Sequence, residues 1–196
     1  MATTRDRIIT ATNELFRRQG YNGTSLSQIS EASEATIGSI YHFFPGGKEE
    51  LAVAVVETTG EVYRQLFEAI VAEVEGPADG IRAFFAGAAA VLAESDYIDP
   101  CPIGTVAREV ANTSEPLRLA AERAFASWIA SAREFAVGAG AGPHEADRLA
   151  TLFVATVEGA FVLSRTQRSP AALEAAGETF AHLLATIDAA VPGSHS

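Results

Sequence analysis

The sequence contains one cysteine in 196 residues, which excludes two kinds of structure. Cys101 alone cannot form an internal disulfide or a multi-cysteine zinc site. Glu and Arg interrupt the apolar stretches, so we expect no membrane-spanning segment and no membrane partner. The N-terminal segment MATTRDRIITATNELF is charged and amphipathic, and it lacks the apolar core and cleavage site of a secretory signal. We therefore expect a cytoplasmic protein with no cofactor and no metal.

Residues suited to catalysis are also scarce. The candidates are Cys101, His144, Glu158 and His182. Cys101 lies between two prolines with no base near it in the sequence, and His144 follows Pro143 at a predicted helix start, where a solvated cap residue is typical. The sequence has no His-Glu-x-x-His metal motif and no glycine-rich phosphate loop. We therefore predict that the chain is not an enzyme.

Basic residues are outnumbered, and their distribution matters more than the net charge of −11. Residues 1–50 carry five basic and six acidic side chains, whereas residues 51–196 carry nine basic and nineteen acidic ones. The excess acid therefore lies in the second part of the chain. This excess acid weakens non-specific binding to nucleic acid, so any affinity for DNA has to come from a few specific contacts. With 48% hydrophobic and 20% charged residues, the chain is not disordered.

The window from Thr24 to Leu51 carries the most information. Ser25 begins a capping-box pattern, with Gln28 three residues later, and this predicts a helix start. Thr36 begins a second helix that runs into the aromatic segment at residues 41–44. Two short helices joined by a tight turn form the unit that places its second helix in the major groove of DNA.

The surrounding residues make this pattern more specific. An amphipathic segment from Ile8 to Phe16 precedes the helix pair, and the motif YHFFPGGKEEL follows it at residues 41–51. In this order, residues 4–52 resemble the DNA-binding domain of TetR-family repressors. The resemblance implies a three-helix DNA-binding domain with a helix-turn-helix over residues 1–47.

The position of each polar side chain suggests its role on DNA. The start of the recognition helix near Thr36 favours a phosphate, and Ile37 and Ser39 can reach base edges. The resemblance implies backbone or base contacts for Tyr41 and His42 and a phosphate contact for Lys48. The predicted DNA-binding set is Thr24, Ser25, Thr36, Ile37, Ser39, Tyr41, His42 and Lys48.

Each of these residues also has a purely structural explanation. The hydroxyl residues cap helices whether or not DNA is present. Phe43 and Phe44, and with them Tyr41, can close the core of the small domain, and Lys48 can be a solvated lysine beside Glu49. Gly38 within the recognition helix suggests close approach to a neighbouring helix or to DNA.

The rest of the chain shows helical periodicity and no strand-like alternation, which predicts an all-α fold of about nine helices. Gly76 and Pro77 end one long helix, because Gly suits a C-cap and Pro cannot continue the helix. The predicted helices after the first domain are 48–75, 78–94, 103–111, 116–137, 144–167 and 170–190.

This second part resembles one subgroup of the family, the LmrA/YxaF-like regulators, at residues 101–104 (CPIG), 107–109 (ARE) and 157–160 (VEGA). The resemblance implies a helical ligand-binding and dimerisation domain over residues 48–196. Aromatic residues recur on several of its helices with polar residues among them, as in apolar ligand pockets, although each aromatic could equally be ordinary core. The expected effector is small and hydrophobic or aromatic. The predicted ligand-binding set is Phe67, Phe84, Phe85, Cys101, Arg108, Phe125, Trp128, Phe153, Glu158 and Phe161.

The last two predicted helices have wide apolar faces with many small residues. The resemblance implies that they pair with those of a second copy, so that two recognition helices meet successive major grooves of a roughly palindromic double-stranded operator, about 34–36 Å apart. The implied function is a homodimeric repressor released by its effector. The alternative is a helical ligand-binding dimer without DNA-binding function, because the chain is acidic and its recognition helix has no Arg or Lys.

Overall fold

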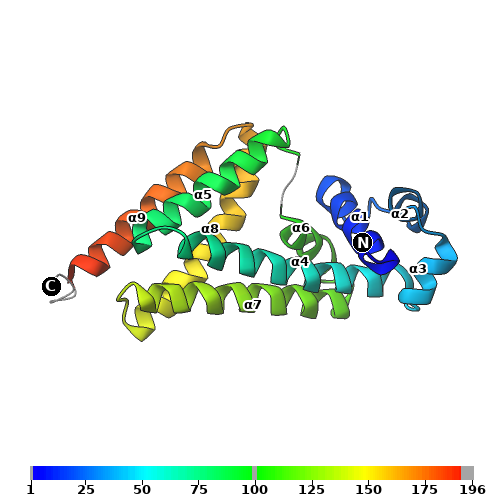
Figure 1. Cartoon of the computed structure of the whole chain (residues 1–196), viewed down its shortest axis with the longest axis horizontal. Helices are drawn as coiled ribbons and strands as arrows, with labels where there is room; N and C mark the ends of the chain where they lie inside the picture. Colours follow the sequence, from blue (N-terminus) through cyan, green and yellow to red (C-terminus); the bar gives the residue numbers. More distant parts are fainter. Residues whose placement is uncertain (1, 99–100, 191–196) are drawn as a thin grey trace. The chain divides into compact units, whose positions relative to one another are not determined.

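The computed structural model describes residues 2–98 and 101–190, with the side chains of residues 2–98 and 101–187. Within these ranges the chain forms nine helices and no strand, which confirms the all-α prediction (Figure 1). The first four are α1 Thr4–Gln19, α2 Leu26–Ser33, α3 Ile37–Phe43 and α4 Gly47–Ala72. The others are α5 Pro77–Glu94, α6 Pro102–Val110, α7 Glu115–Gly138, α8 Pro143–Gln167 and α9 Ala171–Ala190.

Hydroxyl side chains begin the two short helices α2 and α3. Ser25 caps α2, and Gln28 closes the capping box by accepting a hydrogen bond from the Ser25 backbone N–H. Thr36 caps α3, where its Oγ1 accepts from the backbone N–H of Ser39 at 3.1 Å. Such caps satisfy N–H groups that have no acceptor within the helix. Both helix starts predicted from the sequence are confirmed.

Prolines begin three other helices, namely α5, α6 and α8. The first N–H of a helix lacks an intrahelical acceptor, so proline loses no hydrogen bond there. Helix α4 ends at Ala72, earlier than the predicted residue 75. The chain bends over residues 73–76 and passes through Gly76, whose φ is +86°, before Pro77 begins α5.

The chain divides into two compact units, each described here by itself. The first combines residues 1–62 with 99–124, and the second combines residues 63–98 with 125–196. These divisions fall within α4 and α7, and α6 belongs to the first unit because it packs on α1. The functional domain boundary at residue 47 stays a prediction.

In the first unit, α1 packs against α2, α3 and α6. The apolar face predicted for the first helix is buried here, because Ile8 and Phe16 have no exposed surface. The largest fully buried side chains of the unit include Phe16, Ile8, Ile29, Ile40, Phe44 and Leu51.

In the second unit, α5 runs alongside α9, and α8 also contacts α9 (Figure 1). Gly177 permits the close approach of α9 to α5, because a Cβ atom there would lie 2.8 Å from the Cβ of Phe85. Five phenylalanine rings from α4, α5, α8 and α9 form an aromatic cluster with centroid separations of 5.3 to 6.3 Å. They are Phe67, Phe84, Phe85, Phe153 and Phe180.

Helix α8 is unusually apolar along its length. One 18-residue stretch has a mean hydropathy of 1.3, and 33% of it is buried. Length and composition alone would allow α8 to cross a membrane, a test that core helices of soluble proteins also pass. Leu152, Val162 and Leu163 are 40 to 53% exposed. The described part of a single chain therefore leaves much of the apolar surface of α8 uncovered.

Candidate functional site

Helices α2 and α3 are joined by a three-residue turn at residues 34–36. Glu34 adopts a left-handed conformation with a φ of 52°, which ends α2 and redirects the chain. Ser30 Oγ fixes the turn by donating to the carbonyl oxygen of Ala35 at 2.6 Å. A helix, a short ordered turn and a second helix make up a helix-turn-helix.

The second helix of this pair, α3, has one buried and one exposed face. Ile40 is fully buried and Phe44, at its C-cap, is 2% exposed, so these two anchor the helix. Ile37, Tyr41 and Phe43 are 44, 49 and 37% exposed. The core interpretation is therefore correct for Phe44 but wrong for Phe43, because two adjacent residues point to different sides of the helix.

Gly38, near the start of α3, adds no side chain to the exposed face of this helix. A Cβ atom on Gly38 would meet only Thr36 Oγ1, at 3.7 Å. Close approach to a neighbouring helix of the described chain does not explain this glycine. The predicted contacts Ile37, Tyr41 and His42 are all exposed on the same short helix.

The hydroxyl groups of the predicted set have different surroundings. Ser25 and Thr36 are exposed at the starts of α2 and α3, and Thr36 Oγ1 also shares a hydrogen bond of 2.9 Å with Ser39 Oγ. Thr24 is 2% exposed and its Oγ1 donates to the carbonyl oxygen of Gly20 at 2.7 Å. The predicted phosphate contact through the Thr24 side chain is therefore corrected: this hydroxyl fixes the turn after α1.

Lys48, in the first turn of α4, is the single lysine of the sequence. Its Nζ lies 4.2 Å from the ring centroid of Tyr21, a cation–π contact. Burial lowers the pKa of Lys48, and the nearby Glu109 carboxylate opposes this change. Lys48 is thus a half-buried lysine whose ammonium group contacts an aromatic ring of the turn before α2. Tyr21 was missed as a site residue, because in the sequence it marks only a turn.

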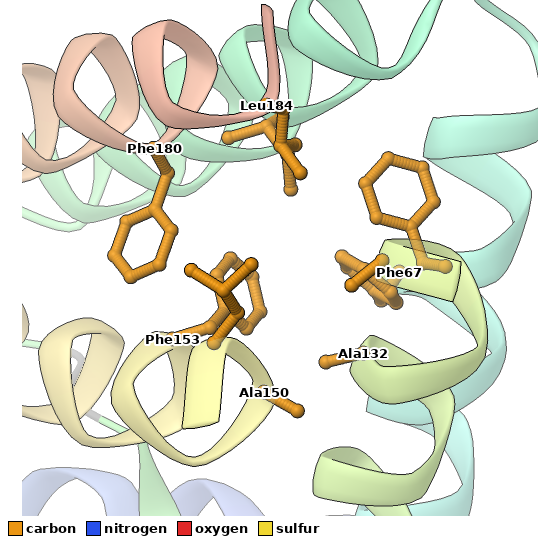
Figure 2. Close-up of a pocket in the computed structure, with 10 residues that line it drawn as sticks. Phe67, Ala132, Ala150, Phe153, Phe180 and Leu184 are labelled. Atoms are coloured by element: carbon orange, nitrogen blue, oxygen red, sulfur yellow. The ribbon is translucent and has the colours of Figure 1, made fainter. Parts of the chain in front are cut away.

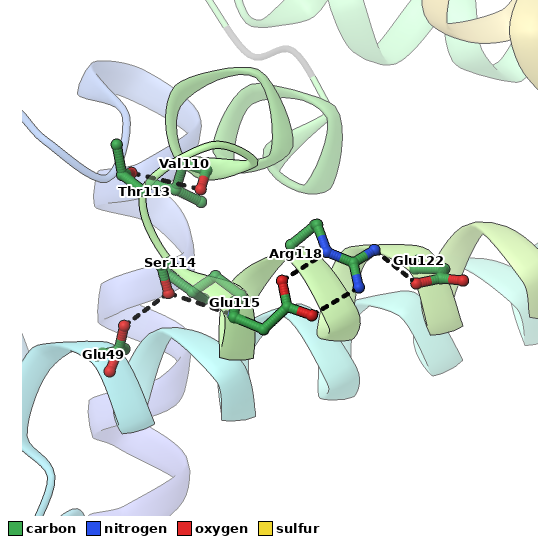
Figure 3. A network of polar contacts seen from close by, with 8 residues as sticks. Glu49, Val110, Thr113, Ser114, Glu115, Arg118 and Glu122 are labelled. Carbon is green, nitrogen blue, oxygen red and sulfur yellow. Dashed lines mark hydrogen bonds and ion pairs between the residues drawn. The ribbon is translucent and has the colours of Figure 1, made fainter.

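Two carboxylates join α4 and α6 to the rest of the first unit. Glu109 Oε2, on α6, accepts from the backbone N–H of Asn22 at 2.8 Å. Glu49 Oε1, on α4, accepts from Ser114 Oγ at 2.6 Å, and Ser114 in turn caps the start of α7 by accepting from Leu117 N (Figure 3). These pairs are 87 and 65 residues apart, so no local sequence pattern indicates them.

The second unit contains a small apolar cavity of about 20 Å³. The side chains around it, drawn in Figure 2, are all hydrocarbon and contain no nitrogen, oxygen or sulfur; among them are Phe67, Phe153 and Phe180 from three helices. This volume is close to that of a single water-sized site and far below that of a drug-sized ligand pocket. The full lining is Phe67, Ile81, Ala132, Phe135, Ala136, Leu149, Ala150, Phe153, Phe180 and Leu184.

The predicted ligand-binding residues lie in different parts of the structure: two line the cavity, six lie elsewhere in the second unit, and two lie in the first unit. Phe67 and Phe153 line the cavity. Phe84 and Phe85 belong to the same aromatic cluster, and Phe125, Trp128 and Phe161 pack against the core of the second unit, while Glu158 is half-buried on α8. Cys101 and Arg108 lie in the first unit and do not line this cavity: Cys101 is the buried N-cap of α6, and Arg108 is exposed.

A polar group that the sequence did not single out lies in the same unit. Ser131 Oγ donates to Glu68 Oε1 at 2.8 Å, and Arg64 pairs with the same carboxylate. Nearby in the sequence, the rings of Tyr63 and Trp128 stack with centroids 6.1 Å apart. The Arg64–Glu68 pair has the i,i+4 spacing of one helix, whereas spacing does not reveal the Ser131–Glu68 and Tyr63–Trp128 pairs, since α4 and α7 are far apart along the chain.

Two family models match the chain. The model described as "Bacterial regulatory proteins, tetR family" matches residues 8–55. The model described as "Transcriptional regulator LmrA/YxaF-like, C-terminal domain" matches residues 77–179, more than half of the chain.

The chain belongs to the TetR family.

Curated relatives agree with this assignment of a TetR-family transcriptional regulator. YxaF of Bacillus subtilis, an HTH-type transcriptional regulator, is 37% identical over 164 residues, which cover 84% of this chain and 86% of YxaF. The HTH-type transcriptional regulator LmrA of the same organism is 36% identical over 165 residues, covering 84% of this chain and 88% of LmrA. These relatives are named as regulators and not as enzymes.

Solved structures share the TetR-family fold. Regulatory protein TetR from Rhodobacter sphaeroides has a TM-score of 0.82 at 22% identity, covering 92% of this chain and 98% of that one. A TetR transcriptional regulator from Chloroflexus aurantiacus has a TM-score of 0.73 at 30% identity, covering 93% and 94%. The family and the fold predicted from the sequence are both confirmed.

Proposed function

We propose that this TetR-family regulator is a cytoplasmic repressor that binds a roughly palindromic operator as a homodimer. The observation that carries the proposal is the exposed face of α3, where Ile37 and Tyr41 remain 44 and 49% exposed on a helix anchored by Ile40. Exposed aromatic and aliphatic side chains beside a bare Gly38 suit a surface that meets base edges and thymine methyl groups.

Lys48 and the caps supply the phosphate contacts of this proposal. Thr36 and Ser25 stand at the exposed starts of α3 and α2, where backbone N–H groups favour an anion. The Lys48 ammonium group, in the same unit, lies over the Tyr21 ring at 4.2 Å. Because α3 has no Arg or Lys, we infer that phosphate contacts provide register and that base reading depends on few contacts and on DNA shape.

Two features of the second unit support the proposed homodimer and the proposed effector. Leu152, Val162 and Leu163 leave an apolar face on α8, which we propose pairs with α8 and α9 of a second copy. The carbon-lined cavity favours a hydrophobic or aromatic effector, and its small size implies that the surrounding helices separate when the effector enters. Such a change would release DNA by favouring a conformation with wrongly spaced recognition helices.

The test is a gel-shift titration against DNA from immediately upstream of the gene for this chain. Tyr41→Ala and Lys48→Ala should each weaken specific binding, and Lys48→Ala should also lower the slope of log affinity against log salt by about two, one for each subunit of the dimer. Arg123→Gln, which removes an exposed positive charge from α7 outside the proposed DNA and dimer surfaces, is the matched control and should change neither. Absence of binding to this DNA, and to DNA selected from the whole genome, would favour the ligand-binding dimer without DNA-binding function.

A further inference from the structure

The carboxylate of Glu109 lies directly against the turn that joins α1 to α2. Its Oε2 accepts a hydrogen bond from the Asn22 N–H at 2.8 Å. A Cβ atom on Gly20 would lie 1.8 Å from Glu109 Oε1, so the carboxylate occupies the space that any side chain there would fill. Gly20 also has a φ of +76°, a conformation that side-chain-bearing residues rarely adopt. The turn is thus shaped to receive this carboxylate.

The same turn holds two parts of the proposed DNA-binding surface. Tyr21, between Gly20 and Asn22, carries the ring on which the Lys48 ammonium group lies at 4.2 Å. Thr24 donates to the carbonyl oxygen of Gly20, and Ser25 follows at once as the N-cap of α2. The turn therefore contacts both Lys48, through Tyr21, and the start of α2, through Thr24 and Ser25.

We propose that Glu109 is a positioning residue for DNA binding, which acts from α6 through the Asn22 N–H on Tyr21, Lys48 and the start of α2. The inference rests on the proposed operator binding. It assigns a function to the Ala107-Arg108-Glu109 motif that the helix-turn-helix does not explain.

The direction in which DNA affinity changes when the Glu109 carboxylate is removed distinguishes a positioning role from simple charge repulsion. An acidic side chain close to a DNA-binding surface repels phosphate, so its removal should strengthen binding if charge were its only contribution. A positioning role predicts the opposite, because truncation leaves the Asn22 N–H without its acceptor and releases the turn.

Three variants distinguish the two roles. Glu109→Ala should weaken binding to the upstream DNA about tenfold, from the loss of a charge-assisted hydrogen bond. Glu109→Gln keeps an acceptor of the same length and should bind within about threefold of the unmodified chain. Glu109→Asp keeps the charge but shortens the side chain, and should resemble Glu109→Ala.

Hydrogen exchange at the Asn22 amide, followed by NMR, reports on the contact without DNA. Exchange should be slow in the unmodified chain and in Glu109→Gln, and faster in Glu109→Ala and Glu109→Asp. Circular dichroism checks that each variant folds. Glu94→Ala, which removes one exposed carboxylate of α5 in the second unit, is the control and should leave both readouts unchanged.

Equal or tighter binding by Glu109→Ala overturns the inference, and so does Asn22 exchange that is the same in all variants. If Glu109→Ala does not fold, the contrast between Glu109→Gln and Glu109→Asp decides, and equal affinities of these two overturn it. If the unmodified chain binds no DNA, the proposed function fails and this inference fails with it. Tight binding by the unmodified chain with no effect of any Glu109 variant rejects this inference alone.

Discussion

Helix α3 of the first unit and the aromatic cluster of the second unit place the same kinds of side chain in opposite environments. On α3 of the first unit, Tyr41 and Phe43 are 49 and 37% exposed. In the second unit, Phe85 and Phe153 are 1 and 8% exposed and contact several other rings. Aromatic residues thus contribute surface on α3 and core in the aromatic cluster, and residue type alone does not tell them apart.

The difference arises from how each helix is held. Helix α3 has only seven residues, and Ile40 and Phe44, four residues apart, anchor one side of it. The other side is only partly covered: the Tyr41 ring lies against Gly47, where an added Cβ atom would be 3.3 Å from it, and Ile37 is 44% exposed. In the second unit, the rings of Phe67, Phe153 and Phe180 come from three helices and face one cavity. We therefore expect α3 to keep its structure when its exposed side chains are truncated, whereas truncation of a ring in the aromatic cluster should destabilise the second unit.

The largest expected effect is on the aromatic cluster. Phe153→Ala should reduce the free energy of unfolding by about 3–5 kcal/mol, because it leaves a cavity among four neighbouring rings. Phe43→Ala, the same substitution on α3, should change it by less than about 1 kcal/mol. Urea unfolding of both variants makes the measurement, and similar losses of stability would show that Phe43 is as important to the fold as Phe153.

Glycine to alanine substitutions test the packing of α5 and α9. Gly177→Ala should destabilise the chain by about 1–3 kcal/mol, because the added Cβ atom would lie 2.8 Å from that of Phe85. Gly87→Ala on α5, where the added atom meets nothing within 4 Å, should stabilise it by up to about 1 kcal/mol. Thermal unfolding compares the two, and two shifts of the same sign would contradict this account of the packing.

The smallest expected change in stability is at Gly38, and it separates stability from binding. Gly38→Ala should stabilise the first unit by up to about 1 kcal/mol, since the new Cβ atom meets only Thr36 Oγ1 at 3.7 Å. If this glycine lets α3 approach DNA closely, the more stable variant should bind the upstream DNA more weakly. Gly87→Ala serves as the control for binding. A Gly38→Ala variant that binds as well as the unmodified chain would refute close approach at this position.

Local patterns were sufficient for much of the fold. The capping box at Ser25, the hydroxyl at Thr36 and the Gly76-Pro77 pair place helix ends where the structure has them, within a few residues. These signals involve neighbours along the chain, so the sequence expresses them directly. The TetR-family motifs added the order of the helices.

The candidate site was less predictable because its contacts are non-local. Glu109 and Asn22 meet across 87 residues, and nothing near either residue indicates the other. Thr24 has the sequence context of a phosphate contact, but tertiary packing buries it at 2% exposure. Cys101 was grouped with the effector residues by resemblance, and the structure instead makes it the N-cap of α6.

The exposed half of α3 also bears on how this regulator can change over evolutionary time. Because Ile37 and Tyr41 lie outside the core, substitutions there have little effect on the stability of the domain. New combinations of side chains at these positions can therefore arise without a compensating change elsewhere in the protein. If α3 reads the operator as proposed, a duplicated copy of such a gene could acquire a different target sequence in a few steps, while its helical scaffold stays intact.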